Sequence, residues 1–287
     1  MANLYEDRHW ASADGLTLHY RDYTGPDNNS RPPIVCLHGL TRNARDFGAL
    51  AAHLVNRFRV IVPEMRGRGQ SDYATDSSSY NPRQYVADVE LLLNSLNIEQ
   101  FAVIGTSMGG LMTMMLAAAK PGRLVAVVMN DIGPEIDPAG LARIGDYVGQ
   151  GRSYPTWLHA ARSISQVHKS AFPNYDLEQW IEMAKRGCVI SQNGRISYDY
   201  DMAIAEPFKQ TDNAAPANLW PAFEALRGVP MVLVRGALSD LLTPETVKQM
   251  HARNPSMTSV TVPNVGHAPM LDEAEARAAI DSLLAKV

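Results

Sequence analysis

The sequence FAVIGTSMGGLMTMMLAAA, residues 101–119, carries the strongest structural signal in this chain. Its first four residues are apolar and are expected to form a strand, and the residues from Ser107 onward are expected to form a helix. At the junction, Gly105-Thr106-Ser107-Met108-Gly109 matches the pattern G-x-S-x-G. Such a turn must be very tight to lift the serine hydroxyl clear of the sheet, and a Cβ at either glycine would collide with the flanking strand or helix. The segment therefore predicts Ser107 as an exposed nucleophile, with a plain tight turn as the alternative.

Strands and helices are expected to alternate on both sides of this segment. Unbroken apolar runs, typical of parallel strands covered on both faces, occur at residues 34–37 and 60–62, and further strands are expected at residues 124–129, 231–234 and 259–262. Helical spacing or helix-start signals occur at residues 44–56, 81–96 and 244–252 and from residue 272 onward. Residues 8–23 are expected to form two short strands around Asp14-Gly15. Alternating strands and helices imply right-handed crossovers, so we predict an α/β fold with a mostly parallel sheet and helices on both faces.

The alternation stops at residues 133–216, which contain helical pieces and no obvious strand. We predict a helical insertion that sits on the sheet, with residues 1–132 and 217–287 forming the core. Aromatic side chains are concentrated in the insertion, either because they form its own core or because some of them line an apolar pocket for an acyl or alcohol group. The residues predicted to line such a pocket are Tyr147, Trp157, Phe172, Trp180 and Phe208.

Composition and charge exclude several classes of protein. A net charge of −4 without a Lys/Arg run leaves no positive surface for a phosphate backbone, so nucleic-acid binding is not expected. The start of the sequence, MANLYEDRHW, lacks a basic and apolar signal region, and residues 101–119 are interrupted by glycines, so neither secretion nor a membrane span is expected. Cys36 and Cys188 cannot form a disulfide framework. We expect a cytoplasmic protein, and a homo-oligomer is compatible with the sequence.

Neither a metal nor a cofactor is predicted. His159, His168, Asp199 and Asp201 are metal-ligating residue types, but their spacing fixes no coordination geometry, and solvated or structural roles are expected. Ser107 occupies the place of the second glycine of a dinucleotide-binding fingerprint, and the lysine of a phosphate-binding loop is missing.

A serine nucleophile needs a base within hydrogen-bonding distance and an acid that orients this base. His267 follows the last expected strand and Asp240 follows the strand before it, so both should reach the carboxyl edge of the sheet, where catalytic groups of open α/β sheets gather. We predict His267 as the base and Asp240 as the acid. Asp131, at the end of the preceding strand, is the competing acid, although we expect it to hold the entry into the insertion by local backbone hydrogen bonds.

An oxyanion in the transition state needs backbone N–H donors. The Met108 N–H follows the nucleophile at a helix N-terminus, where donors are free and the helix dipole is favourable. The second donor should come from the loop His38-Gly39-Leu40-Thr41, and we predict the Leu40 N–H. His38 is interpreted as a buried turn-former rather than as a second base.

Several of these motifs together resemble the α/β-hydrolase fold superfamily, in particular its capped esterases, lactonases and C–C hydrolases. The motifs are His38-Gly39, PEMRGRGQS at residues 63–71, GTSMGG at residues 105–110, Asp240 and Gly266-His267. The resemblance implies an eight-stranded, mostly parallel sheet with a helical cap inserted after strand six. It also implies the roles already given to Ser107, His267, Asp240, Leu40 and Met108. Glu64 stands where members often carry Asp, and we expect a structural role for it in a turn held by Arg66 or Arg68.

The sequence therefore predicts a cofactor-free serine hydrolase of the esterase or lactonase kind (EC 3.1.1). Its expected partner is a small-molecule carboxylic ester or lactone, cleaved through an acyl-enzyme. Ser107 replaces the Asp of related dehalogenases and epoxide hydrolases, so those activities are not expected. C–C bond hydrolysis of ring-cleavage products and cofactor-free perhydrolysis are the alternatives within enzymes. A ligand-sensing protein with negligible turnover is the alternative from another class.

Overall fold

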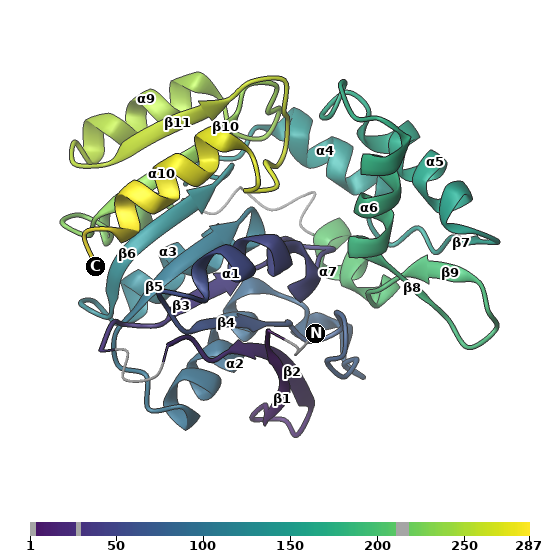
Figure 1. The fold of residues 1–287 in the computed structure, drawn as a ribbon, viewed down its shortest axis with the longest axis horizontal. Helices are drawn as coiled ribbons and strands as arrows, with labels where there is room; N and C mark the ends of the chain where they lie inside the picture. Colours follow the sequence, from purple (N-terminus) through teal and green to yellow (C-terminus); the bar gives the residue numbers. More distant parts are fainter. Residues whose placement is uncertain (1–3, 27–29, 211–217) are drawn as a thin grey trace.

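The computed structural model describes residues 4–26, 30–210 and 218–287, with the backbone alone for residues 208–210. Eight strands form one sheet in the order β1-β2-β4-β3-β5-β6-β10-β11 (Figure 1). The pairs β1–β2 and β2–β4 are antiparallel and all other pairs are parallel, so the predicted eight-stranded, mostly parallel sheet is confirmed. The strands are β1 (Glu6–Ala11), β2 (Thr17–Tyr23), β3 (Ile34–Leu37), β4 (Val60–Pro63), β5 (Phe101–Thr106), β6 (Leu124–Asn130), β10 (Met231–Gly236) and β11 (Thr258–Val262).

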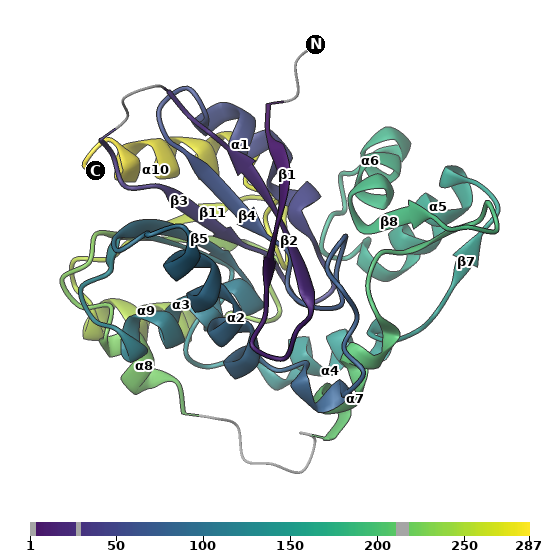
Figure 2. The same ribbon diagram turned by 90° about the horizontal axis from the view of Figure 1, so that it is seen from below.

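Helices cover both faces of this sheet (Figure 2). One face carries the short 3-10 helix η1 (Ala44–Phe47), α1 (Gly48–Leu54) and α10 (Ala274–Leu284). The other carries α2 (Pro82–Ser95), α3 (Met108–Ala119), α8 (Trp220–Glu224) and α9 (Pro244–Arg253). A further 3-10 turn, η2 (Ser77–Ser79), precedes α2. No helix in the described ranges combines the length and apolar character that a membrane span requires.

The central strands are apolar throughout because alternate residues enter different cores. In β5, Phe101 and Val103 pack into the layer of α2 and α3, whereas Ala102 and Ile104 pack into the layer of α1 and α10. Several helices, among them α2 and α9, begin at a residue whose side chain caps the helix. The Asn81 side chain, for example, accepts a hydrogen bond from the Gln84 N–H, which fixes the start of α2.

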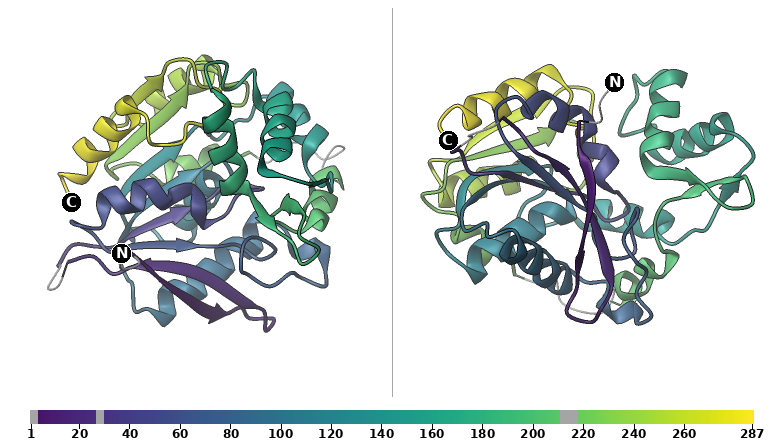
Figure 3. Two further views of the ribbon diagram at one scale, coloured as in Figure 1. Left: turned by 45° about the vertical axis from the view of Figure 1, so that its right-hand side comes forward. Right: turned by 60° about the horizontal axis from the view of Figure 1, so that its bottom comes forward.

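Residues 138–210, called the insertion below, lie to one side of the main sheet (Figures 1 and 3). Their elements are α4 (Pro138–Tyr147), β7 (Ser153–Tyr154), α5 (Trp157–His168), α6 (Leu177–Gly187), β8 (Cys188–Ile190), β9 (Ile196–Tyr198), η3 (Met202–Ile204) and α7 (Ala205–Gln210). The expected helices are present, but β7, β9 and β8 also form a small antiparallel sheet, which was not expected from the sequence. These strands contain only two or three residues each, too few to show a strand period.

The core holds the insertion through side chains that follow β3. Asn43 Nδ2 and Arg45 Nε both donate to the Arg186 carbonyl near the end of α6, at 3.1 and 3.0 Å. Arg45 also forms an ion pair with Asp199 at 2.8 Å. These contacts fix the end of α6 against the loop that leaves the carboxyl end of β3.

Candidate active site

Ser107 occupies a strained turn between β5 and α3. Its backbone has φ 52° and ψ −116°, a conformation that L-residues rarely adopt. The flanking glycines make the turn possible. A Cβ on Gly105 would lie 2.6 Å from the Gly109 carbonyl oxygen, and a Cβ on Gly109 would lie 2.0 Å from the Leu37 carbonyl oxygen. The collisions expected from the sequence are therefore present on both sides of Ser107.

His267 lies in the loop between β11 and α10 and contacts Ser107 directly. His267 Nε2 is 2.9 Å from Ser107 Oγ. The loop is also bound to the insertion, because the Gly266 N–H donates to the Ala171 carbonyl at 2.6 Å. A Cβ on Gly266 would lie 2.8 Å from the Ala171 Cα, so this approach requires glycine. The position of His267 thus depends on the core and on the insertion.

Asp131 holds the other ring nitrogen of His267. The distance from His267 Nδ1 to Asp131 Oδ2 is 2.8 Å. Asp131 is fully buried directly after β6, and its carboxylate also accepts hydrogen bonds from Ser239 Oγ at 2.6 Å and from the Gly236 N–H at 2.9 Å. Three donors on one carboxylate fix its orientation, so Ser107, His267 and Asp131 form one hydrogen-bonded chain.

The prediction of Asp240 as the partner of His267 is wrong in this geometry. Asp240 instead binds the guanidinium of Arg143 from α4, with Oδ1 2.9 Å from Nη2. Burial raises the pKa of Asp240, but the hydrogen bonds and charge of Arg143 outweigh it and leave the pKa below its usual value. After β10 ends at Gly236, a turn closed by the Ser239 N–H on the Gly236 carbonyl presents Ser239, and not Asp240, to Asp131. Asp131 follows its strand immediately, whereas Asp240 stands four residues beyond Gly236.

The loop after β3 carries the Leu40 amide past Ser107. A Cβ on Gly39 would lie 3.7 Å from Ser107 Cβ. His38 fixes this loop, because its Nδ1 donates to the Gly39 carbonyl at 2.8 Å and its Nε2 accepts the Met65 N–H at 3.0 Å. Burial lowers the pKa of His38 to about 4, which matches this neutral form and the expected turn-forming role. Within the described residues, neither the Leu40 nor the Met108 N–H has a hydrogen-bond partner.

The turn at residues 63–71 supports the same loop. Arg68 Nε donates to the Leu40 carbonyl at 3.0 Å. The structural role expected for Glu64 is present, and Arg68 holds the turn through a hydrogen bond from its Nη1 to the Arg66 carbonyl at 2.7 Å, although neither arginine binds Glu64 itself. Glu64 accepts the backbone N–H of Ala44 at 2.9 Å and of Gln70 at 2.8 Å, and Arg66 binds Asp88 and Asp14 instead. Glu64 thus closes its own turn, and Arg68 connects this turn to the Leu40 loop.

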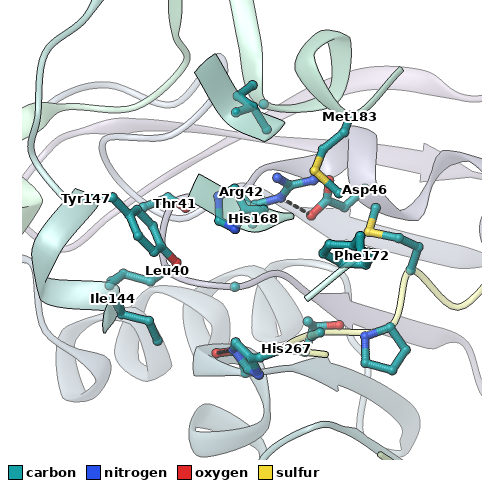
Figure 4. Close-up of a pocket in the computed structure, with 18 of the residues that line it drawn as sticks. Leu40, Thr41, Arg42, Asp46, Ile144, Tyr147, His168, Phe172, Met183 and His267 are labelled. Atoms are coloured by element: carbon teal, nitrogen blue, oxygen red, sulfur yellow. Dashed lines mark hydrogen bonds and ion pairs between the residues drawn. The ribbon is translucent and has the colours of Figure 1, made fainter. Parts of the chain in front are cut away.

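A cavity of about 120 Å³ opens at Ser107 and His267, between the core and the insertion (Figure 4). Of the five predicted pocket residues, Tyr147 and Phe172 line it. Trp180 does not, because its ring packs behind Phe172 with the ring centroids 6.3 Å apart. Trp157 does not line the cavity either and packs against the hydrophobic cluster that contains Phe172 and Trp180. The Phe208 side chain lies outside the described residues.

Two polar residues that sequence reasoning did not place in the pocket line it as well. Arg42 extends into the cavity from the loop after β3, and His168 enters it from the end of α5. Burial, together with the positive charges of Arg42 and Arg143, lowers the pKa of His168 to about 3. Arg42 stands two residues after Leu40, and this proximity to the predicted oxyanion loop could have identified it.

Residue types that bind metals do not assemble here. Asp199 is paired with Arg45, and Asp201 accepts the Tyr80 hydroxyl at 2.5 Å. Among the residues that the model describes, no group of three or more His, Cys, Asp or Glu side chains is placed to hold a metal ion.

The fold agrees with the comparison to known proteins. Residues 34–280 match the alpha/beta hydrolase family, and the chain belongs to this family. It is 38% identical over 257 residues to 3-hydroxybutyrate-oligomer hydrolase from Cupriavidus necator, a match that covers 87% of this chain and 86% of that one. It is 25% identical over 252 residues to 2-(acetamidomethylene)succinate hydrolase from Mesorhizobium japonicum, covering 88% and 85% of the two chains. The crystal structure of an alpha/beta hydrolase from Novosphingobium aromaticivorans superimposes with a TM-score of 0.95 at 52% identity and covers 100% of both chains.

Proposed function

We propose that this protein is a serine hydrolase that cleaves a carboxylic ester through an acyl-enzyme. The observation that carries the proposal is the chain of hydrogen bonds from Ser107 Oγ through His267 to Asp131, at 2.9 and 2.8 Å. It has the order of nucleophile, base and orienting acid that acyl transfer requires, and it lies beside two unoccupied backbone N–H donors.

The residues of the site have distinct roles in the proposed reaction. Ser107 Oγ attacks the ester carbonyl carbon while His267 Nε2 takes its proton, and the Leu40 and Met108 N–H groups stabilise the oxyanion. His267 then gives this proton to the leaving alcohol as the carbon–oxygen bond breaks. A water molecule activated by His267 attacks the acyl-enzyme and regenerates Ser107. Asp131 holds the imidazole tautomer and stabilises the imidazolium.

The substrate class that we propose is a short oligoester of a hydroxy acid. The 38% identical relative is named for hydrolysis of such an oligomer, and the cavity here has both apolar and polar walls. We also propose that the insertion acts as a cap, since Ile144, Tyr147 and Phe172 from the insertion line the same cavity as Ser107 and His267. An ester, unlike a C–C substrate, yields an acid and an alcohol, so product masses separate the two reactions.

The test combines covalent labelling with turnover. Incubation with a fluorophosphonate, followed by intact mass and peptide mapping, should give one adduct on Ser107. Ser107→Ala should give no adduct and should lower kcat for the 3-hydroxybutyrate dimer about 10⁴-fold or more, with an unchanged circular dichroism spectrum. Folded wild-type protein that is neither labelled nor active on the dimer or on p-nitrophenyl esters would contradict the proposed function and favour a sensor.

A further inference from the structure

Arg42 presents an unused hydrogen-bonding edge to the cavity. Its Nε and Nη2 both bind the Asp46 carboxylate, each at 2.6 Å, and this fork fixes the plane of the guanidinium (Figure 4). Its Nη1 has no hydrogen-bond partner within the described residues, and it lies 3.6 Å from where a Cβ on Gly187 would stand. Arg42, Asp46 and Gly187 all line the cavity, so the free edge of the guanidinium faces the space that a substrate would fill.

The base of the Arg42 side chain lies beside the nucleophile. A Cβ on Gly39 would be 3.4 Å from Arg42 Cγ and 3.7 Å from Ser107 Cβ, so both side chains lie next to Gly39. From there the side chain runs along the cavity wall to Gly187. A group bound at Nη1 and a carbonyl at Ser107 would therefore occupy the same cavity, as two parts of one small substrate.

His168 supplies a second polar group without a partner. No hydrogen bond to its ring is present in the described part of the chain, and the ring packs edge-on against Tyr147 with centroids 5.1 Å apart. Because its pKa is about 3, the imidazole is neutral near pH 7 and has one N–H donor. Figure 4 places Arg42, His168 and Tyr147 on one side of the cavity and His267 on the other.

This combination of donors suits an anionic oxygen group. Unpaired N–H groups in a partly buried cavity cost free energy until an acceptor binds them. Asp46 neutralises the charge of Arg42 but leaves both hydrogens of Nη1 available, and hydrogen bonds from a guanidinium to a carboxylate are among the strong ones. The other nearby cation, Arg143, does not line the cavity and has its own carboxylate in Asp240.

We propose that Arg42, with His168 beside it, binds the terminal carboxylate of a hydroxy-acid oligoester. The inference rests on the ester-hydrolase function proposed above and deepens it. In such an oligomer only the last unit has a free carboxylate, and the hydroxyl of that unit is esterified to the neighbouring carbonyl. A carboxylate at Arg42 therefore places the last ester bond at Ser107. Ser107 bonds to that carbonyl, the ester carbon–oxygen bond breaks, and the terminal hydroxy acid leaves with the proton from His267.

The test compares the 3-hydroxybutyrate dimer with its terminal carboxamide, which has the same ester bond and no charge. Wild-type kcat/KM should be about 10- to 100-fold higher for the acid than for the amide, and Arg42→Met should bring this ratio close to one. Arg143→Met removes a nearby cation that is paired with Asp240, so this matched variant should keep the wild-type ratio. Free 3-hydroxybutyrate should inhibit p-nitrophenyl ester hydrolysis competitively, with an inhibition constant at least about 10-fold higher in Arg42→Met.

Other outcomes overturn the subsite and separate it from the function. Equal losses on acid and amide in Arg42→Met would make Arg42 a support of the oxyanion loop only, while ester hydrolysis itself stands. A ratio that falls as far in Arg143→Met would assign the selectivity to the general field of the pocket. Wild-type protein that hydrolyses neither dimer nor p-nitrophenyl esters would overturn the proposed function, and the carboxylate subsite with it.

Discussion

Replacement of Asp131 by Asn should abolish most turnover, although the nucleophile Ser107 and the base His267 are both retained. Both carboxylate oxygens accept hydrogen bonds, Oδ1 from the Gly236 N–H and Oδ2 from Ser239 Oγ and His267 Nδ1. An amide NH₂ would therefore face a donor in either orientation. If it faces His267, the ring must take the tautomer with its proton on Nε2, which cannot accept the Ser107 proton. We expect kcat to fall about 10⁴-fold, equivalent to about 5 kcal/mol of transition-state stabilisation.

The matched control is Asp240→Asn, which removes the partner of Arg143. Because the Asp240 side chain is 38% exposed and does not touch His267, its loss should change kcat by less than about threefold and stability by at most about 1 kcal/mol. Steady-state hydrolysis of p-nitrophenyl butyrate on both variants measures this difference, with circular dichroism showing that each is folded. A larger loss in Asp240→Asn than in Asp131→Asn would refute the assignment of Asp131 as the acid.

Three other substitutions test the supports of this site. Ser239→Ala removes one donor from Asp131 Oδ2 and should lower kcat about 3- to 10-fold without changing KM, whereas an unchanged kcat would limit Ser239 to the fold. Burial lowers the pKa of His38 from 6.5 to about 4, so the unfolded state binds more protons as the pH falls below 6.5. Between pH 7.5 and 5, wild type should lose about 2 kcal/mol of unfolding free energy that His38→Gln retains, and equal losses in urea titrations would disprove this. Gly109→Ala should prevent folding or lower Tm by more than about 10 °C. Gly48→Ala should instead stabilise the protein by about 0.5 kcal/mol, because Gly48 is helical and a Cβ there would meet no atom within 4 Å. Equal Tm values for the two variants in thermal melts would contradict both expectations.

The sheet could be predicted because its strands are buried on both faces. Every residue of β3 and β4 is buried, and such runs are visible in a sequence without knowledge of the partners. Ser107 and His267 could be placed for a related reason. The nucleophile needs a turn that only small neighbours permit, and the base follows a strand that must end at the carboxyl edge.

The acid could not be chosen by the same argument. β6 and β10 are adjacent and parallel, so Asp131 and Asp240 both start from the same edge. The choice depends on a turn of a few residues after β10, whose hydrogen bonds to Asp131 form only in the folded chain. The order of the residues along the chain favours Asp240 as the acid. In the folded chain, however, Asp240 binds Arg143 and not His267.

The insertion was the least predictable part. Its strands β8 and β9 are too short for a period, although Asn193-Gly194 between them is a recognised hairpin signal. Its aromatic residues look alike in sequence. Phe172, in the connection between α5 and α6, lines the cavity, whereas Trp180, on α6, packs behind it, and this difference depends on tertiary packing that the sequence pattern does not reveal.

The hydrogen bond from Gly266 to the Ala171 carbonyl sets a rule for building chimeras. A transplant of residues 138–210 from another member of the family replaces the group that positions the residue before His267. Such a hybrid changes its substrate preference only if the donor segment offers a carbonyl at the place of Ala171. Without it, we expect the hybrid to turn over every substrate poorly, because the residue before His267 has lost its contact, so a failed exchange of specificity should be examined first at this hydrogen bond.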